Sequence, residues 1–224
     1  MGIQLPPWVW IGTACLAGIA GMVNAVGYLG FEHQAVSHLT GTTTLLGIAL
    51  AQGQAVAARE LLLVALAFLL GAIASGLIIQ DSTLKLGRRY GVALAIEAVL
   101  LAASVPLFER GLVWGAVLAA AACGLQNAMV ATYSGALVRT THVTGLFTDL
   151  GVAIGHWLRG LPVGPRRFAL CVLVIVAFLA GGTLGAWLFA LLEYRALYVP
   201  AALTGSVGIG YAAYRQHRLA AGAG

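Results

Sequence analysis

The residue types that could do chemistry are concentrated in two copies of one short motif. The copies are identical at seven of fourteen positions and read HLTGTTTLLGIALA (His38–Ala51) and HVTGLFTDLGVAIG (His142–Gly155). At the start of a helix, free backbone N–H groups and a partial positive charge suit an anion or a polar solute. Threonine hydroxyls add hydrogen bonds, and glycine lets a solute or backbone approach closely. The candidate solute-binding residues are therefore His38, Thr40, Gly41, His142, Thr144 and Gly145. Alternatively, each histidine only caps its helix.

A second pair of similar segments lies upstream of the two copies. Gly21–Ala25 reads GMVNA and Gly124–Ala128 reads GLQNA, so that an asparagine precedes each histidine, by 14 residues at Asn24 and by 15 at Asn127. An amide inside an apolar segment requires hydrogen-bond partners. Each asparagine therefore either lines a solute pathway or ties its helix to the backbone that precedes the motif.

Two acidic residues are candidates for proton coupling. Asp149 follows His142 by seven residues, two helical turns, which places both on one helix face, and its counterpart in the first copy is Leu45. Glu97 lies inside a long apolar run. A charge at the membrane centre costs roughly 2.5–3.5 kcal/mol on insertion scales, so such residues are functional candidates. The alternatives are a salt bridge between Asp149 and Arg139 and a structural pairing of Glu97.

The composition indicates a membrane protein. Of the 224 residues, 61% are hydrophobic and only 8% are charged, against about 25% charged in an ordinary soluble domain. The mean hydropathy is +0.96. Six runs are long enough to cross roughly 30 Å of hydrocarbon as helices: Trp8–Phe31, Leu61–Ile79, Gly91–Phe108, Leu112–Ala131, Phe168–Leu192 and Leu197–Tyr214.

The two HxTG segments are too short to cross. Fourteen residues span roughly 21 Å as a helix. If both segments are re-entrant, nine basic residues share one face (Lys85, Arg88, Arg89, Arg139, Arg159, Arg166, Arg167, Arg215 and Arg218) and three the other (Arg59, Arg110 and Arg195). This asymmetry favours the re-entrant topology, with both termini in the cytoplasm.

Each half then crosses the membrane three times, so the second half has the inverted orientation. The sequence predicts an all-α polytopic membrane protein with six transmembrane helices plus two short re-entrant HxTG half-helices, built as two inverted-topology repeats. The first repeat is residues 1–110 and the second is 111–224, within one integral membrane domain. Sites in such proteins tend to lie between the repeats, near the bilayer midplane.

Four segments resemble the YoaK-like family of bacterial inner-membrane proteins: Asn24–Leu29, Ser37–Gly41, Gly124–Ala128 and Arg139–Gly145. The likeness covers nearly the whole chain. It implies about six spans and a bacterial plasma-membrane location, but no substrate, because the family's domain has no known function. Family members often carry an aspartate where this chain has Asn24, so the resemblance implies no acidic role there.

The leading hypothesis is a small secondary transporter or channel-like permease for a small polar or anionic solute, and not an enzyme. It requires no cofactor, metal or nucleic acid, and its partners are the bilayer, the solute and, as is common for permeases of this size, further copies of the chain. A first alternative is a metal- or haem-binding redox protein that uses His38 and His142 as ligands. A second is an accessory membrane subunit without transport activity.

Overall fold

The structure is a computed structural model, and it describes residues 7–30, 36–79, 88–133 and 140–221. Within these ranges the chain is helical and contains no strand. The elements are α1 (Pro7–Gly30), α2 (Leu39–Ala51), α3 (Ala55–Ile78), α4 (Arg88–Glu109), α5 (Val113–Tyr133), α6 (Val143–Leu158), α7 (Pro165–Leu192), the 3-10 helix η1 (Glu193–Leu197) and α8 (Tyr198–Ala221).

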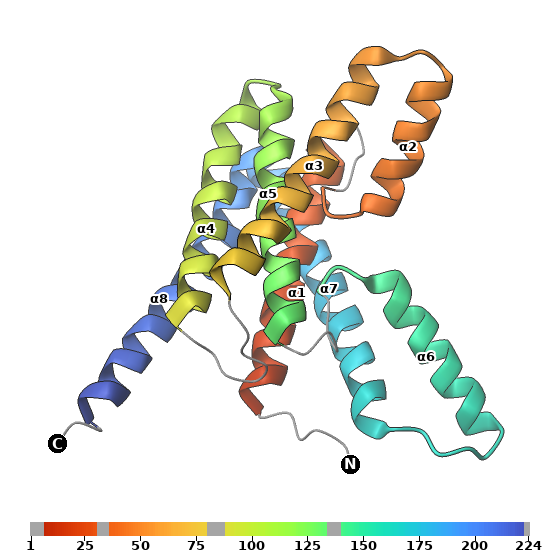
Figure 1. The fold of residues 1–224 in the computed structure, drawn as a ribbon, viewed down its shortest axis with the longest axis vertical. Coiled ribbons are helices and arrows are strands. Elements are labelled where there is room, and N and C mark those ends of the chain that lie inside the picture. Colours follow the sequence, from red (N-terminus) through yellow and green to blue (C-terminus); the bar gives the residue numbers. More distant parts are fainter. Residues whose placement is uncertain (1–6, 31–35, 80–87, 134–139, 222–224) are drawn as a thin grey trace.

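Five helical segments are long and apolar enough to cross a membrane: Val9–Gly30, Ala55–Ile78, Arg89–Glu109, Val113–Thr132 and Pro165–Gly210. The last of these contains α7, η1 and the first part of α8. The two final predicted spans therefore lie in one apolar stretch, which turns back at η1 (Figure 1). The protein is a multi-pass helical membrane protein.

Two helices are short. α2 has 13 residues and α6 has 16. α2 packs against α3, and α6 packs against α7. A glycine with positive φ makes the turn after each short helix, Gly53 (φ 68°) after α2 and Gly160 (φ 71°) after α6, a conformation that a side chain disfavours. In Figure 1, α2 runs from the middle of the molecule to its upper end, whereas α6 runs from the middle to the lower end.

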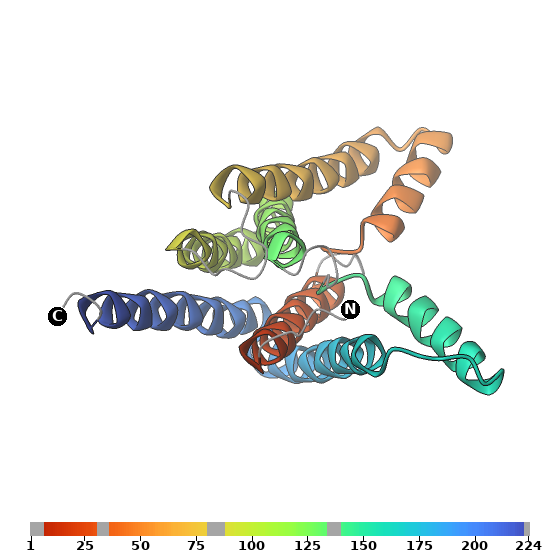
Figure 2. The same cartoon turned by 60° about the horizontal axis from the view of Figure 1, so that its bottom comes forward.

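The long helices pair across the two halves of the sequence. α1 packs along α7, and α3 packs along α5, while α4 packs against both α5 and α8. The helices of the α1–α7 pair and of the α3–α5 pair are parallel, as Figure 1 shows by the direction of the colours. Figure 2 shows α4 and α8 on the side of the molecule opposite α2 and α6.

Glycines bring the paired helices into backbone contact. A Cβ atom at Gly21 would overlap the carbonyl oxygen of Phe178, and one at Gly124 would overlap the carbonyl oxygen of Phe68. The facing helices also carry a glycine at each crossing, since a Cβ at Gly181 would meet the Gly18 backbone and one at Gly71 would meet the Ala121 backbone. Small residues at such crossings are how helices pack closely in lipid, where no hydrophobic effect drives them together.

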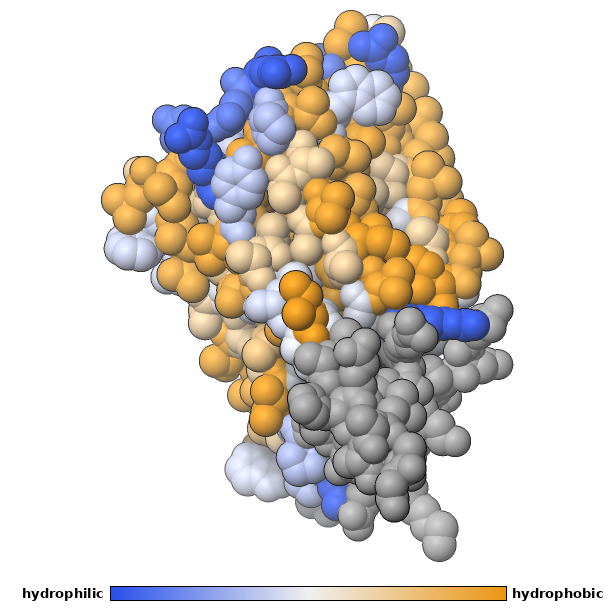
Figure 3. Space-filling model, turned by 90° about the vertical axis from the view of Figure 1, so that its left-hand side faces the viewer, coloured by the Kyte–Doolittle hydropathy of each residue, from blue (hydrophilic) through white to orange (hydrophobic). Residues whose placement is uncertain are grey.

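The outer surface is apolar. α3 exposes a stripe of large aliphatic side chains: Leu62, Leu66, Leu69, Leu70, Ile73 and Leu77. In Figure 3, hydrophobic residues cover much of the middle of the face on the α4 and α8 side, and hydrophilic residues gather towards its upper end. An exposed apolar surface of this extent marks a membrane or protein contact, and the spanning helices identify it as the lipid contact.

Some helix ends differ from the prediction. α3 begins at Ala55 rather than Leu61, because the turn at Gly53 is followed directly by alanine-rich sequence that forms helix readily. α6 continues three residues beyond the motif's last residue, Gly155, to Leu158. Two predicted topology residues, Lys85 and Arg139, lie outside the described residues.

Candidate functional site

Each motif histidine stands immediately before a short helix. His38 occupies the N-cap position of α2 and His142 that of α6, and neither side chain caps its own helix. Their carbonyl oxygens accept the first helical hydrogen bonds, from Thr42 N–H and from Leu146 N–H, each at 3.2 Å. The N-terminal ends of the two helices lie next to each other near the centre of the molecule in both views (Figures 1 and 2).

The two imidazoles make different contacts. The His38 ring stacks on Phe178 of α7, with 6.0 Å between ring centroids and 28° between planes. The His142 ring instead folds over its own helix, because a Cβ at Gly145 would overlap its Nε2 atom. A Cβ at the equivalent Gly41 would meet nothing within 4 Å. Both histidine residues are nevertheless partly exposed at the N-terminal ends of the two short helices.

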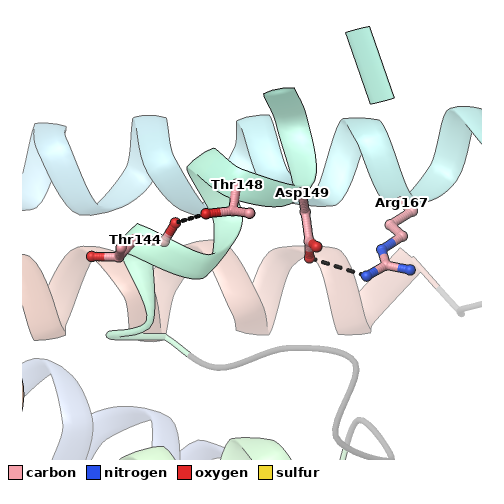
Figure 4. Close-up of polar contacts among 4 residues, drawn as sticks. All are labelled: Thr144, Thr148, Asp149 and Arg167. Carbon is pink, nitrogen blue, oxygen red and sulfur yellow. Dashed lines mark hydrogen bonds and ion pairs between the residues drawn. The ribbon is translucent and has the colours of Figure 1, made fainter. Parts of the chain in front are cut away.

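The threonines repeat in the same geometry. The Thr44 hydroxyl donates to the Thr40 carbonyl at 2.9 Å, and the Thr148 hydroxyl donates to the Thr144 carbonyl at 3.0 Å (Figure 4). Thr40 and Thr144 are themselves exposed. The motif is therefore HxTGxxT, in which the first threonine is exposed and the second bonds to the backbone of its own helix.

The two asparagines have different surroundings. Asn24 is 5% exposed. Its amide nitrogen donates to the Ala20 carbonyl at 2.8 Å, and its Oδ1 accepts from the Ser37 backbone N–H at 3.2 Å and from the Ser37 hydroxyl at 2.8 Å. Asn24 thus ties α1 to the residue before His38. Asn127 Oδ1 is buried and has no hydrogen-bond partner in the described part of the chain.

The two candidate acids occupy different environments, and neither lies at the N-terminal end of α2 or of α6. Asp149 lies on α6 and pairs with Arg167 at 3.1 Å, with 42% and 75% of the two side chains exposed (Figure 4). Arg139, its expected partner, falls outside the described residues. Glu97 lies on α4 and is 2% exposed.

Sequence reasoning did not identify four of these contacts. Ser37 and Phe178 hold the first motif, Thr204 of α8 faces Glu97, and Arg167 pairs with Asp149. Thr44 and Thr148 had a visible signal, because they occupy one of the seven identical positions. Among the residues described, no group of three or more His, Cys, Asp or Glu side chains could hold a metal ion.

Comparison with known proteins places the chain in a family. Residues 12–210 match the model of a family described as "Protein of unknown function (DUF1275)". The chain belongs to this family. The match covers most of the sequence and confirms the resemblance inferred from the paired HxTG motifs. No curated protein and no solved structure matches the chain.

Proposed function

We propose that this member of the DUF1275 family is a small secondary transporter or channel-like permease for a small polar or anionic solute. The observation that carries the proposal is that the N-terminal ends of the short helices α2 and α6 lie next to each other near the centre of the molecule. Both begin with a histidine and an exposed threonine, and both present their N-terminal ends at that place (Figures 1 and 2). Backbone that is not helical at membrane depth is tolerated where protein buries it or where it lines a water-filled cavity.

The proposal includes two inverted repeats with re-entrant half-helices. Opposite directions of α2 and α6 support this, as do the equivalent pairs α1 with α7 and α5 with α3. The crossings use matching residues, since Gly21 and Gly124 each meet the carbonyl of a Phe-x-x-Gly segment, Phe68–Gly71 or Phe178–Gly181. A two-fold axis between the two halves would produce the opposite helix directions, the equivalent helix pairs and the matching glycine crossings.

The orientation in the membrane follows from charge. The lower ends of the helices in Figure 1 carry Arg88, Arg89, Arg159, Arg166 and Arg167, whereas the upper ends carry Arg59, Arg110 and Arg195. An excess of basic residues marks the cytoplasmic side. We therefore assign the lower end, with both chain termini, to the cytoplasm of a bacterial cell and the protein to its inner membrane.

The solute would bind between the helix heads. Free N–H groups of the first helical turns, the hydroxyls of Thr40 and Thr144 and the imidazoles of His38 and His142 are donors suited to an anion or to an uncharged polar molecule. Gly41 leaves the backbone accessible, whereas Gly145 makes room for the His142 ring. Asn24 and Asn127 would support the two entrances, and Asp149 and Glu97 are the acids available for proton coupling.

The test is solute flux in liposomes that contain the purified protein. A panel of small anions and uncharged polar solutes is offered to the wild type, to His142→Gln and to Thr144→Ala. Thr183→Ala is the matched control, because Thr183 is an exposed threonine on α7 whose hydroxyl bonds to the Leu179 carbonyl of its own helix at 2.9 Å. We expect at least a tenfold loss of flux in the first two variants and none in the control.

Each outcome has a consequence. Loss of flux in Thr183→Ala as well as in Thr144→Ala would mean that the assay reports general damage, which contradicts the assigned site. If the wild type moves no member of the panel, the permease proposal fails. An absorbance spectrum and metal analysis of the same sample then test the alternative, in which His38 and His142 are metal or haem ligands.

A further inference from the structure

Glu97 is the one buried acid among the described residues. Its side chain is 2% exposed, and its Oε2 atom has no hydrogen-bond partner in the described part of the chain. The acids Glu109 and Asp149 have exposed side chains and pair with Arg195 at 2.8 Å and with Arg167 at 3.1 Å. Glu97 is therefore the acid that lacks both water and a cation.

Two uncharged groups face the Glu97 carboxyl. The Thr204 hydroxyl of α8 faces it, and the Cys123 thiol of α5 lies within the electrostatic range of its charge. Thr204 is fully buried, and its Oγ1 also lacks a hydrogen-bond partner among the described residues. The Thr204 hydroxyl can donate a hydrogen bond to the carboxyl but carries no positive charge. A proton on the carboxyl would remove the buried negative charge, with which no cation among the described residues pairs.

The helices on both sides of this pair are packed closely. A Cβ at Gly91 of α4 would lie 3.3 Å from the Gly208 carbonyl oxygen of α8, and one at Gly205 would lie 3.5 Å from the Ala98 Cβ. The seam, defined here as the contact of α4 with α8 at Gly91, Ala98, Gly205 and Gly208, encloses Glu97 and Thr204. An ionised carboxylate within it would be neither hydrated nor paired, a state that proteins avoid.

We propose that Glu97 is a proton-binding site and that its protonation controls the seam. With the proton on the carboxyl, α4 and α8 stay packed as in this structure. Release transfers the proton from the carboxyl oxygen to a water molecule, and the carboxylate that remains requires water, so α4 and α8 separate. Because it names the coupling ion of the permease, the proposal rests on the proposed function. It assigns coupling to Glu97 rather than to Asp149, whose charge Arg167 already neutralises.

The test reads the proton directly by infrared spectroscopy of the full-length protein in membranes. The wild type should show the carbonyl band of a protonated carboxylic acid, and the band should disappear reversibly as the pH rises. Glu97→Gln should lose the band at every pH. Glu109→Gln is the matched control, because it makes the same change to an exposed acid at the end of the same helix, and it should leave the band unchanged.

A cross-link tests the seam. Ala98→Cys with Gly205→Cys, in a background without Cys15, Cys123 and Cys171, places two Cβ atoms at the 3.5 Å separation seen at this contact, within the range of a disulfide. In the oxidised protein the band should persist at a pH that abolishes it in the reduced protein. If Glu97→Gln does not fold, Thr204→Val should still shift the band, because it removes the facing hydroxyl.

The failures of the two proposals are distinguishable. A band that is absent, that never responds to pH, or that titrates identically with the cross-link closed would overturn the proton site, whatever the flux. A band that disappears as the pH rises, but persists when the cross-link is closed, supports the proton site even if no solute is transported. In that case only the permease proposal fails. In a transporting protein, Glu97→Gln should abolish proton-driven accumulation and leave solute exchange in place.

Discussion

Among the described residues, the start of the first HxTG segment is hydrogen-bonded and stacked to two long helices, whereas the second segment is joined to the bundle along α7. Ser37, just before α2, is bound by Asn24 of α1, and His38 stacks on Phe178 of α7. In the second half, Asn127 Oδ1 has no hydrogen-bond partner among the described residues, and the His142 ring lies on its own helix. The start of the motif is thus fixed to neighbouring helices in one half and is more self-contained in the other.

This difference suggests a division of labour between the halves. An element with fewer bonds to its surroundings opens at lower free energy than a well-anchored one. We therefore expect α6 to be the part that moves during a transport cycle and α2 to be the fixed wall of the site. Substitutions at equivalent positions of the two halves should show where the halves are equal and where they differ.

The largest effect should be equal in the two halves. Gly21→Ala and Gly124→Ala each place a Cβ against backbone atoms of a facing helix, so the helices must separate, at a cost of about 3 kcal/mol or more. Yield of monodisperse protein and thermal unfolding in detergent measure this loss. Gly47→Ala and Gly151→Ala are matched controls, because a Cβ there meets nothing within 4 Å. Unequal losses at Gly21 and Gly124 would contradict equivalent crossings.

A smaller effect should separate the halves. Asn24→Ala leaves the Ser37 N–H and hydroxyl without their acceptor, which should destabilise the protein by about 1–3 kcal/mol. Asn127→Ala removes an oxygen that accepts no hydrogen bond in the described part of the chain, so its cost should stay below about 1 kcal/mol. Unfolding temperatures of the two variants provide the measurement. Equal destabilisation would mean that the second asparagine is anchored as firmly as the first.

The smallest effect concerns the ion pair of Asp149 with Arg167, which joins α6 to α7 in the second half. Asp149 and Arg167 are both substantially exposed, so their coupling in a double-mutant cycle with Asp149→Asn and Arg167→Gln should be under about 1 kcal/mol. The pair Glu109 with Arg195 at the opposite end has similar exposure and serves as the reference. A coupling well above that of the reference would show that the Asp149 pair is a structural anchor for α6.

Local sequence patterns predicted the long helices and the residues at which the two short helices begin. Long apolar runs locate the long helices because a span needs about 20 apolar residues, and the repeated HxTG letters locate the starts of α2 and α6. The partners of the polar side chains were beyond that reasoning. Asp149 of α6 pairs with Arg167 of the neighbouring helix α7, and Glu97 faces Thr204 more than 100 residues later in the sequence. Such contacts depend on how helices rotate against each other, which periodicity in a membrane helix leaves undetermined.

The cross-half pairing also has a consequence for biosynthesis. Gly21 finds its packing partner only when the region of Gly181 has been made, 160 residues later. At about 5–20 residues per second, the ribosome needs roughly 8–32 s to supply it. During that interval the glycine face of α1 stands in the bilayer or the insertion machinery without its partner. The two halves of the chain, expressed as separate polypeptides, should therefore be degraded individually but accumulate when they are made together.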